Sequence, residues 1–255
     1  MITRRALEEL ARKQKLSLGN AEKDYLLDLV LRSIAQHCPH TLVFKGGTCL
    51  YKFHQLPRFS EDLDFSGIKM LDINDFVKKI LADLEKEGVY AKEHTRKEPY
   101  NSVLITLQVK GPLLSENPSS SASVGIDINF KSEVVLPIEQ KKYVSIYLGI
   151  GEISILGMKP EEMFAEKLRA LLTRFKARDL FDIYFLINQD IWASRELIQA
   201  KMNYYQEIFS LPKILERIDV FEPIWDKEIS GLTKNTLSFE AVSAHVKQKL
   251  REKYA

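Results

Sequence analysis

Hydrophobic and polar positions divide the chain into a mixed first part and a helical second part. In the first forty residues, apolar side chains recur at helical spacing, at Leu26, Leu27, Val30, Leu31 and Ile34. A second amphipathic helix is predicted from 73 to 86, and Gly88 ends it. From Lys159 to the end, helical patterns dominate and no strand pattern is evident.

Short apolar or alternating segments predict strands in the first part. The run 41–44 is apolar, and 62–66 alternates polar and apolar residues as a half-buried strand does. Further strands are predicted at 103–109, 124–130, 143–147 and 153–156. The segment SENPSSSAS, 115–123, is predicted to be a connecting loop. Because strands lie on one side of a boundary and helices on the other, we predict an α+β fold, with domains at 1–158 and 159–255.

Composition excludes several classes of protein. The net charge of +2 over 255 residues gives no global field for nucleic acid, so any basic site must be local. No apolar run approaches the ~18 residues of a membrane span, and the first residues lack a signal-peptide pattern. Cys38 and Cys49 lack the spacing of a zinc site or a disulfide framework, so both are predicted to be buried thiols in a reducing compartment. We therefore expect a cytoplasmic protein without a membrane partner.

One stretch, FKGGTCLYKFHQLPRFSEDLDFS at 44–66, carries candidate chemistry. Asp62 and Asp64 are two residues apart, so on a strand both carboxylates point to one face. Two neighbouring carboxylates repel each other unless a cation lies between them, and hard oxygen ligands suit Mg²⁺. The alternative interpretation of this pair is a solvated strand face.

Two further features accompany the acid pair. Gly46, Gly47 and Thr48 follow a predicted strand and precede a predicted helix at 49–53. Glycines let a backbone approach a ligand closely, and a helix N-terminus presents free N–H groups to phosphate. In VGIDINF, Asp127 alternates with isoleucines and would join the pair if its strand lies beside theirs.

Basic residues lie near the acids in sequence. Lys45, Lys52 and Arg58 could each contact phosphate or nucleic acid. The alternative for each of them is an ordinary surface charge.

The glycine turn and the acid pair together resemble the signature of polymerase-β-like nucleotidyltransferases. In that superfamily a glycine turn precedes a Dx[DE] pair, and a later strand supplies a third acid. Here fourteen residues separate Gly47 from Asp62, which is at the long end of the pattern. The fuller string KGGTCLYKF…RFSEDLDFS is similar to the AbiEii/AbiGii-type toxins, which include the MenT toxins. This resemblance implies a mixed-sheet nucleotidyltransferase-like domain followed by a helical domain.

A second segment, KPEEMFAEKLRALLTRFKARDLFDIYFL at 159–186, also resembles that family. Its first helix has an apolar stripe at Phe164, Leu168, Leu171 and Phe175. Lys167 flanks this stripe, and its sequence position alone would favour an ammonium group that reaches water. The resemblance instead implies a cation that reaches the nucleotide phosphates across an interdomain cleft.

The acids of the next predicted helix are Asp179 and Asp182, one turn apart. One interpretation is purely structural: Arg178 and Asp182, at i and i+4, would form an ion pair that stabilises the helix by only ~0.3–0.5 kcal/mol. The resemblance implies a role for the "RD..D" element beside the active site, at the same cleft as Lys167. The last 65 residues contain aromatics such as Tyr204, Tyr205 and Trp225, but no chemistry can be assigned to them.

Taken together, these motifs predict a metal-dependent nucleotidyl transfer. Asp62, Asp64 and Asp127 would hold Mg²⁺ or Mn²⁺, the Gly46-Gly47-Thr48 turn would cradle the phosphates of an NTP, and Lys167 would neutralise them. The resemblance implies a toxin of a toxin–antitoxin or phage-defence system, which modifies the 3′ end of tRNA and is restrained by a cognate antitoxin. Two alternatives stay open. The acceptor could be a protein or a small molecule such as an aminoglycoside, or the chain could be a non-catalytic nucleotide-binding regulator.

Overall fold

The chain folds into two compact units in a computed structural model that describes residues 1–114, 121–131, 133–233 and 237–255. The first, here called the sheet unit, comprises Met1–His54, Ser60–Glu133 and Ile138–Gly157. The second, the helical unit, comprises Gln55–Phe59, Val134–Pro137 and Met158–Ala255. Two short segments that precede Met158 therefore belong to the helical unit.

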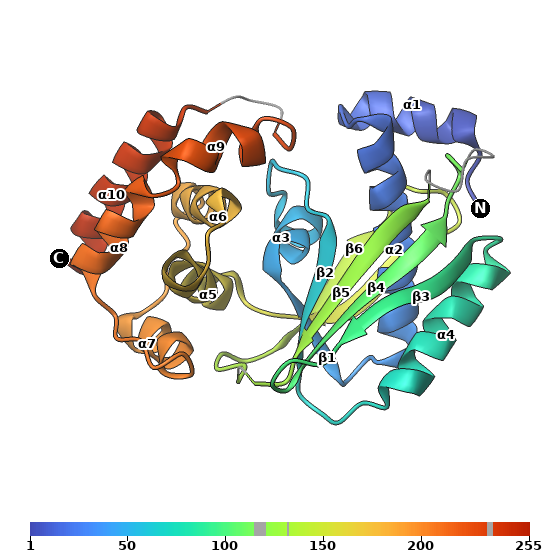
Figure 1. Ribbon diagram of the computed structural model, residues 1–255, viewed down its shortest axis with the longest axis horizontal. Coiled ribbons are helices and arrows are strands. Elements are labelled where there is room, and N and C mark those ends of the chain that lie inside the picture. The colour runs from blue at the N-terminus through green and yellow to red at the C-terminus, as the bar shows by residue number, and fades with distance from the viewer. Residues whose placement is uncertain (115–120, 132, 234–236) are drawn as a thin grey trace. The chain divides into compact units, whose positions relative to one another are not determined.

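A seven-stranded mixed sheet forms the centre of the sheet unit (Figure 1). Its strands are β1 (Leu42–Lys45), β2 (Asp62–Gly67), β3 (Tyr90–Lys97), β4 (Ser102–Lys110), β5 (Ala122–Asn129), β6 (Glu139–Val144) and β7 (Glu152–Gly157). Their order across the sheet is β3-β4-β5-β2-β1-β7-β6. β2 pairs with β5, and β1 with β7, in parallel, whereas the other neighbouring strands are antiparallel.

Helices α2 and α4 cover one face of this sheet (Figure 1). The helices of the sheet unit are α1 (Arg4–Gln14), α2 (Leu18–His37), α3 (Gly46–His54) and α4 (Ile73–Lys86). Leu63 and Phe65 of β2 are fully buried, and they pair in register with Ile126 and Ile128 of β5, which are also buried. Because side chains alternate along a strand, the polar residues of these strands lie on the opposite face.

The helical unit buries its own core. Its helices are α5 (Pro160–Thr173), α6 (Ala177–Asn188), α7 (Arg195–Asn203), α8 (Leu211–Asp219), α9 (Glu222–Ile229) and α10 (Phe239–Tyr254). Leu180 and Leu186 of α6 and Trp225 of α9 are buried at its centre. Pro160 occupies the first turn of α5, where the missing proline N–H costs no hydrogen bond.

The predicted α+β class is confirmed, and so is the helix at 73–86. The strand predicted at 143–147 is correct only for Tyr143 and Val144, because β6 ends at Val144 and a turn follows in which Gly149 and Gly151 take positive φ. The helix predicted at 49–53 begins three residues earlier, at Gly46. Residues 115–120 of the predicted loop lie outside the described residues, and Ala122 and Ser123 belong to β5.

β3 and β6 carry weak strand signals for a common physical reason. Both are edge strands, and neither contains a buried residue. Their sequences, YAKEHTRK and EQKKYV, are therefore too polar to show an apolar alternation. The predicted burial of Cys38 and Cys49 is confirmed, and both thiols are free.

Candidate active site

The two acids of the DLD motif open β2 and share the polar face of the sheet. Asp62 is exposed and Asp64 is partly buried. In the parallel β2–β5 ladder, Asp64 pairs in register with Asp127. Residues paired in this way project from the same face, so the predicted third acid lies beside the second. On the other side of β2, Lys45 of β1 pairs in register with Asp64.

Two glycines make room for these carboxylates. A Cβ atom added to Gly46 would lie 2.3 Å from Oδ2 of Asp64, and one added to Gly125 would lie 2.5 Å from Oδ1 of Asp62. Gly46 also has a φ of +74°, which side chains other than glycine adopt with strain. Each carboxylate therefore lies directly against a bare stretch of backbone. Gly125 was not predicted from the sequence. Its spacing could have indicated it, because Gly125 and Asp127 are two residues apart, as are Asp62 and Asp64, with which they pair in register.

The glycine turn is the N-terminus of α3 and is attached to the acid-bearing strand. The first N–H groups of a helix have no partner within the helix, and Gly46, Gly47 and Thr48 form this first turn. The Thr48 hydroxyl is buried and donates a hydrogen bond to the main-chain oxygen of Asp62. This bond holds the turn against β2. A phosphate contact from the same hydroxyl hydrogen would require the bond to break.

Lys52 is not a surface charge and does not face a substrate. It is buried, with Nζ bonded to Asp24 and 2.7 Å from Oδ1 of Asp28, both on α2. Burial by itself would lower the pKa of Lys52, but the two carboxylates raise it well above its usual value. The predicted phosphate or solvent contact of Lys52 is therefore wrong. No local pattern indicates this pairing, because Asp24 and Asp28 belong to an earlier helix.

The predicted role of Arg58 is corrected in the same way. Its guanidinium is buried and binds Asp182 through two hydrogen bonds of 2.6 and 2.7 Å. Both residues belong to the helical unit, although Arg58 precedes the DLD motif by only four positions. Arg58 thus binds a carboxylate of α6.

Lys167 is buried and lies at the centre of a cluster of ion pairs in the helical unit. Its Nζ is 2.8 Å from Oδ1 of Asp179 and 2.7 Å from Oδ2 of Asp182. Arg174 binds Asp179 through two further bonds of 2.7 Å. The sequence position of Lys167 alone favoured an ammonium group that reaches water, and that prediction is wrong. We call Arg58, Lys167, Arg174, Asp179 and Asp182 the ion cluster.

The ion cluster joins three cations to two carboxylates. Burial by itself would lower the pKa of Lys167 and raise the pKa of Asp179. Their mutual attraction outweighs burial, so the pKa of Lys167 is raised and the pKa of Asp179 is lowered, and Arg174 lowers the pKa of Asp179 further. Lys167 and Asp179 thus stay ionised near neutral pH. Both aspartates are buried, so neither faces solvent.

One predicted member of the apolar stripe lies elsewhere. Phe164, Leu168 and Leu171 are buried, whereas α5 ends at Thr173 and Phe175 lies beyond it with 45% of its surface exposed. Helical spacing alone predicted a buried Phe175. The extended conformation of Arg174 breaks that spacing.

Asp62, Asp64 and Asp127, here called the acid row, fit a hard divalent cation by donor type. Within the described part of the chain, no three His, Cys, Asp or Glu side chains form a group that could hold a metal ion by themselves. Mg²⁺, however, commonly uses one or two protein carboxylates and takes its other ligands from water and phosphate. Asp62 and Asp64, each against a glycine, supply that smaller set.

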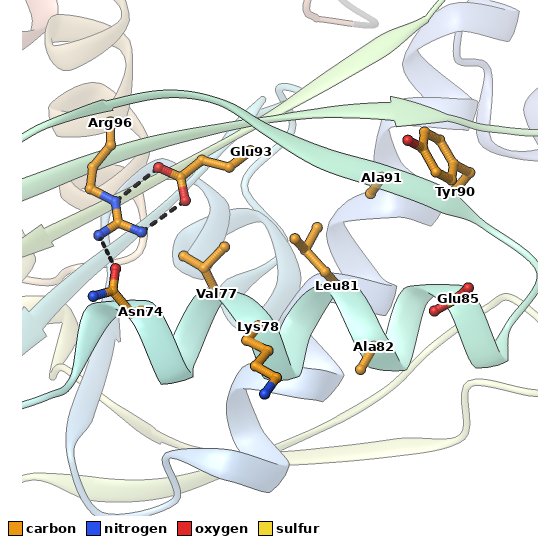
Figure 2. Close-up of a pocket in the computed structure, with 10 residues that line it drawn as sticks. All are labelled: Asn74, Val77, Lys78, Leu81, Ala82, Glu85, Tyr90, Ala91, Glu93 and Arg96. Carbon is orange, nitrogen blue, oxygen red and sulfur yellow. Dashed lines mark hydrogen bonds and ion pairs between the residues drawn. The ribbon is translucent and has the colours of Figure 1, made fainter.

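A separate cavity of about 500 Å³ lies between α4 and β3 (Figure 2). Val77, Leu81 and Ala91 give it apolar walls. At one end, Arg96 is bound by both carboxylate oxygens of Glu93 and by the Asn74 side chain (Figure 2). None of the predicted site residues lines this cavity, so it is distinct from the acid row.

Comparison with known proteins identifies the family. Residues 29–251 match the family described as "Nucleotidyl transferase AbiEii toxin, Type IV TA system". The chain belongs to the AbiEii family. The resemblance read from the two sequence motifs is thereby confirmed, and AbiEii proteins are nucleotidyltransferase toxins of type IV toxin–antitoxin systems. A comparison with curated proteins gave no match.

Solved structures share the fold of this AbiEii chain. MenT4, a nucleotidyltransferase toxin from Mycobacterium tuberculosis H37Rv, is 22% identical, with a TM-score of 0.71 over 98% of this chain and 88% of its own. JHP933 from Helicobacter pylori is 21% identical, with a TM-score of 0.56 over 93% and 92%. A putative nucleotidyltransferase from H. pylori, also 21% identical, has a TM-score of 0.57 over 93% and 95%.

Among the described helices, none combines the length and apolar character needed to cross a membrane.

Proposed function

We propose that this AbiEii protein transfers a nucleoside monophosphate from an NTP to the 3′ end of tRNA. The observation that carries the proposal is the packing of the Asp62 and Asp64 carboxylates against Gly125 and Gly46. This packing joins the acid pair to the N-terminus of α3, where free N–H groups suit phosphate. Carboxylates for a metal and amides for a triphosphate then belong to one continuous surface.

Each predicted residue has a role in this proposal. Asp62, Asp64 and Asp127 would hold Mg²⁺ or Mn²⁺, which when bound would neutralise and orient the triphosphate. Main-chain N–H groups of the Gly46–Thr48 turn would bind the β- and γ-phosphates. Asp127 would also help to activate the attacking hydroxyl.

Lys167 is the proposed cation for the charge of the triphosphate. Asp179 and Asp182 would hold its ammonium group in place, as they do in the ion cluster. Such catalysis depends mainly on position and electrostatics, so small displacements of these groups should reduce the rate strongly.

The biological setting follows from the family. We propose that the chain acts in the cytoplasm as the toxin of a toxin–antitoxin system with a role in phage defence. A cognate antitoxin would restrain it. Growth of cells that express the chain, with and without the neighbouring gene, measures toxicity and its relief.

An acceptor screen tests the proposal. The purified protein is incubated with each α-³²P-labelled NTP and Mg²⁺, together with tRNA, total protein or aminoglycosides in turn. We expect label in tRNA and in no other acceptor. Removal of divalent ions with EDTA should abolish the labelling, and added Mg²⁺ or Mn²⁺ should restore it.

Two outcomes would contradict the proposal. Label found only in protein or in an aminoglycoside would show the same chemistry on a different acceptor. NTP binding without transfer to any acceptor would favour a non-catalytic regulator.

A further inference from the structure

Aromatic and basic side chains follow one another along α5 and the segments beside it, and all of them except the partly buried Arg169 are exposed. We call them the aromatic–basic row: Arg169, Arg174, Phe175, Lys176, Tyr204 and Tyr205. All belong to the helical unit. None is a proposed metal ligand, and of the six only Arg174 belongs to the ion cluster.

Phe175 is an exposed ring held in a fixed position. It stacks on the buried Phe221, with ring centroids 5.7 Å apart and an angle of 22° between the planes. The Arg217 guanidinium lies over both rings, and its Nε donates a hydrogen bond to the Leu171 carbonyl oxygen at the end of α5. Since 45% of Phe175 remains exposed, the ring offers its uncovered surface to a ligand.

Cationic residues precede and follow Phe175 in the sequence. The Arg174 side chain is 55% exposed although it binds Asp179, and the Lys176 side chain is 57% exposed, with Glu228 at 4.0 Å. An apolar protein partner would desolvate both charges. A ligand with a flat ring and neighbouring anionic groups would instead match the ring and the cations together.

The other end of the row repeats the same combination. The Arg169 guanidinium lies 4.3 Å from the centre of the Tyr205 ring, and Tyr204 meets Tyr205 edge to face at 5.1 Å. Both tyrosines are exposed. Arg169 also donates a hydrogen bond to Thr173, beside Arg174, so contacts run from the tyrosines toward Phe175.

We propose that the aromatic–basic row binds single-stranded RNA and so helps to position the acceptor strand; this inference rests on the proposed transfer to RNA. Bases would stack on Phe175 and Tyr204, and phosphates would meet the cations between them. Stacking on aromatic side chains tolerates any base and combines with a basic groove in proteins that bind single strands. The near-neutral net charge is compatible with this surface because the row is a local feature.

Direct RNA binding by the full-length protein tests this inference. The probe is a fluorescein-labelled single-stranded RNA oligonucleotide, and anisotropy is measured with EDTA and without NTP, so that no transfer takes place. We expect Phe175→Ala to weaken binding by between about 5-fold and 100-fold, the usual range for the loss of one stacked base. Phe175→Trp should bind as wild type does, and RNA should quench the fluorescence of the added tryptophan.

The matched control is Tyr100→Ala. Tyr100 is 86% exposed on the sheet unit, and the Lys131 ammonium group lies over its ring, as the Arg217 guanidinium lies over Phe175. This variant should bind RNA as tightly as wild type. Equal affinities of wild type and Phe175→Ala, or an equal loss in Tyr100→Ala, would overturn the inference.

The inference and the proposed function fail in different ways. If wild type labels tRNA while Phe175→Ala binds and labels RNA normally, RNA binding by the row is refuted, whereas the proposed transfer to tRNA is supported. If RNA binding depends on Phe175 but no acceptor is ever labelled, RNA binding by the row is supported and the proposed transfer to tRNA is refuted.

Discussion

Gly46 shows how the absence of one side chain shapes the candidate site. Its bare backbone lies against the Asp64 carboxylate and begins the helix that is expected to receive phosphate. Its positive φ adds a second requirement for glycine. At this position the turn and the acid pair are in contact, although fourteen residues separate Gly47 from Asp62 along the chain.

Substitution of Gly46 should affect activity far beyond its effect on stability. Gly46→Ala would push a methyl group into the Asp64 carboxylate, so we expect at least a 100-fold loss of NMP transfer, the scale of a displaced catalytic group. The left-handed backbone adds roughly 1 kcal/mol of destabilisation. Transfer rates and chemical denaturation measure the two effects separately.

Gly149 provides a matched control for Gly46. It has a φ of +90°, and nothing lies within 4 Å of an added Cβ, so Gly149→Ala reproduces the backbone strain without the collision. We expect it to lower stability similarly and to keep full activity. Equal activity losses in both variants would show that strain, rather than the Asp64 contact, explains the effect.

At the scale of elements, buried ion pairs join segments that are distant in sequence. Lys52 links α3 to two acids of α2, and the Tyr147 hydroxyl donates to one of them, Asp24, at 3.0 Å. In the helical unit, Glu162 accepts the main-chain N–H groups of Val135 and Leu136, and it also binds the buried Lys201.

Loss of Lys52 should destabilise the sheet unit strongly. Lys52→Met would leave Asp24 and Asp28 buried without their cation, which typically costs about 3–5 kcal/mol. Chemical denaturation followed by circular dichroism measures the free energy of unfolding. Lys69→Met, at an exposed position, should change it by less than about 0.5 kcal/mol. A similar small change in both variants would refute a stabilising role for the buried pair.

The contact between α2 and α4 should depend on pH through Asp83. Burial by itself would raise the pKa of Asp83, but hydrogen bonds from Lys86, Ser33 and His37 lower it to about 2 from 3.8. A lowered pKa stabilises the fold at every pH above the ordinary pKa of an aspartate. This stabilisation is lost as the pH falls through about 2. Asp83→Asn should therefore reduce stability by roughly 1 kcal/mol at pH 6.

The pH dependence provides the check on this assignment. The difference in unfolding free energy between wild type and Asp83→Asn should shrink between pH 4 and pH 2. Denaturant titrations across this range measure it. A difference that stays constant or grows toward pH 2 would show that the Asp83 carboxylate is not the group responsible.

At the scale of the whole molecule, the sequence predicted what depends on local patterns. The amphipathic helix at 73–86 and the change to helices after Lys159 are visible because burial repeats at regular spacing. The glycine turn and the DLD pair are visible because their chemistry lies within one short segment. The family match over residues 29–251 agrees with that motif-based reading.

Other features were hidden because they depend on tertiary packing. Arg58 and Asp182 are 124 positions apart, and no local pattern pairs them. Lys52 looked like a surface charge because its partners lie on another helix, and the edge strand β6 lacks the apolar alternation that marks a strand. The fold class was therefore predictable, whereas the partners of the charged residues required the structure.

The central claim is that the DLD pair beside the glycine turn performs nucleotidyl transfer, and one measurement tests it most directly. Initial rates of label transfer from α-³²P-NTP to tRNA are compared for wild type, Asp62→Asn, Asp64→Asn and the exposed control Asp219→Asn, after equal folding is shown by circular dichroism. We predict that each substitution in the pair lowers the rate by at least 1,000-fold, about 4 kcal/mol, whereas the control keeps the wild-type rate. Folded Asp62→Asn and Asp64→Asn proteins that label tRNA as fast as wild type would contradict the claim.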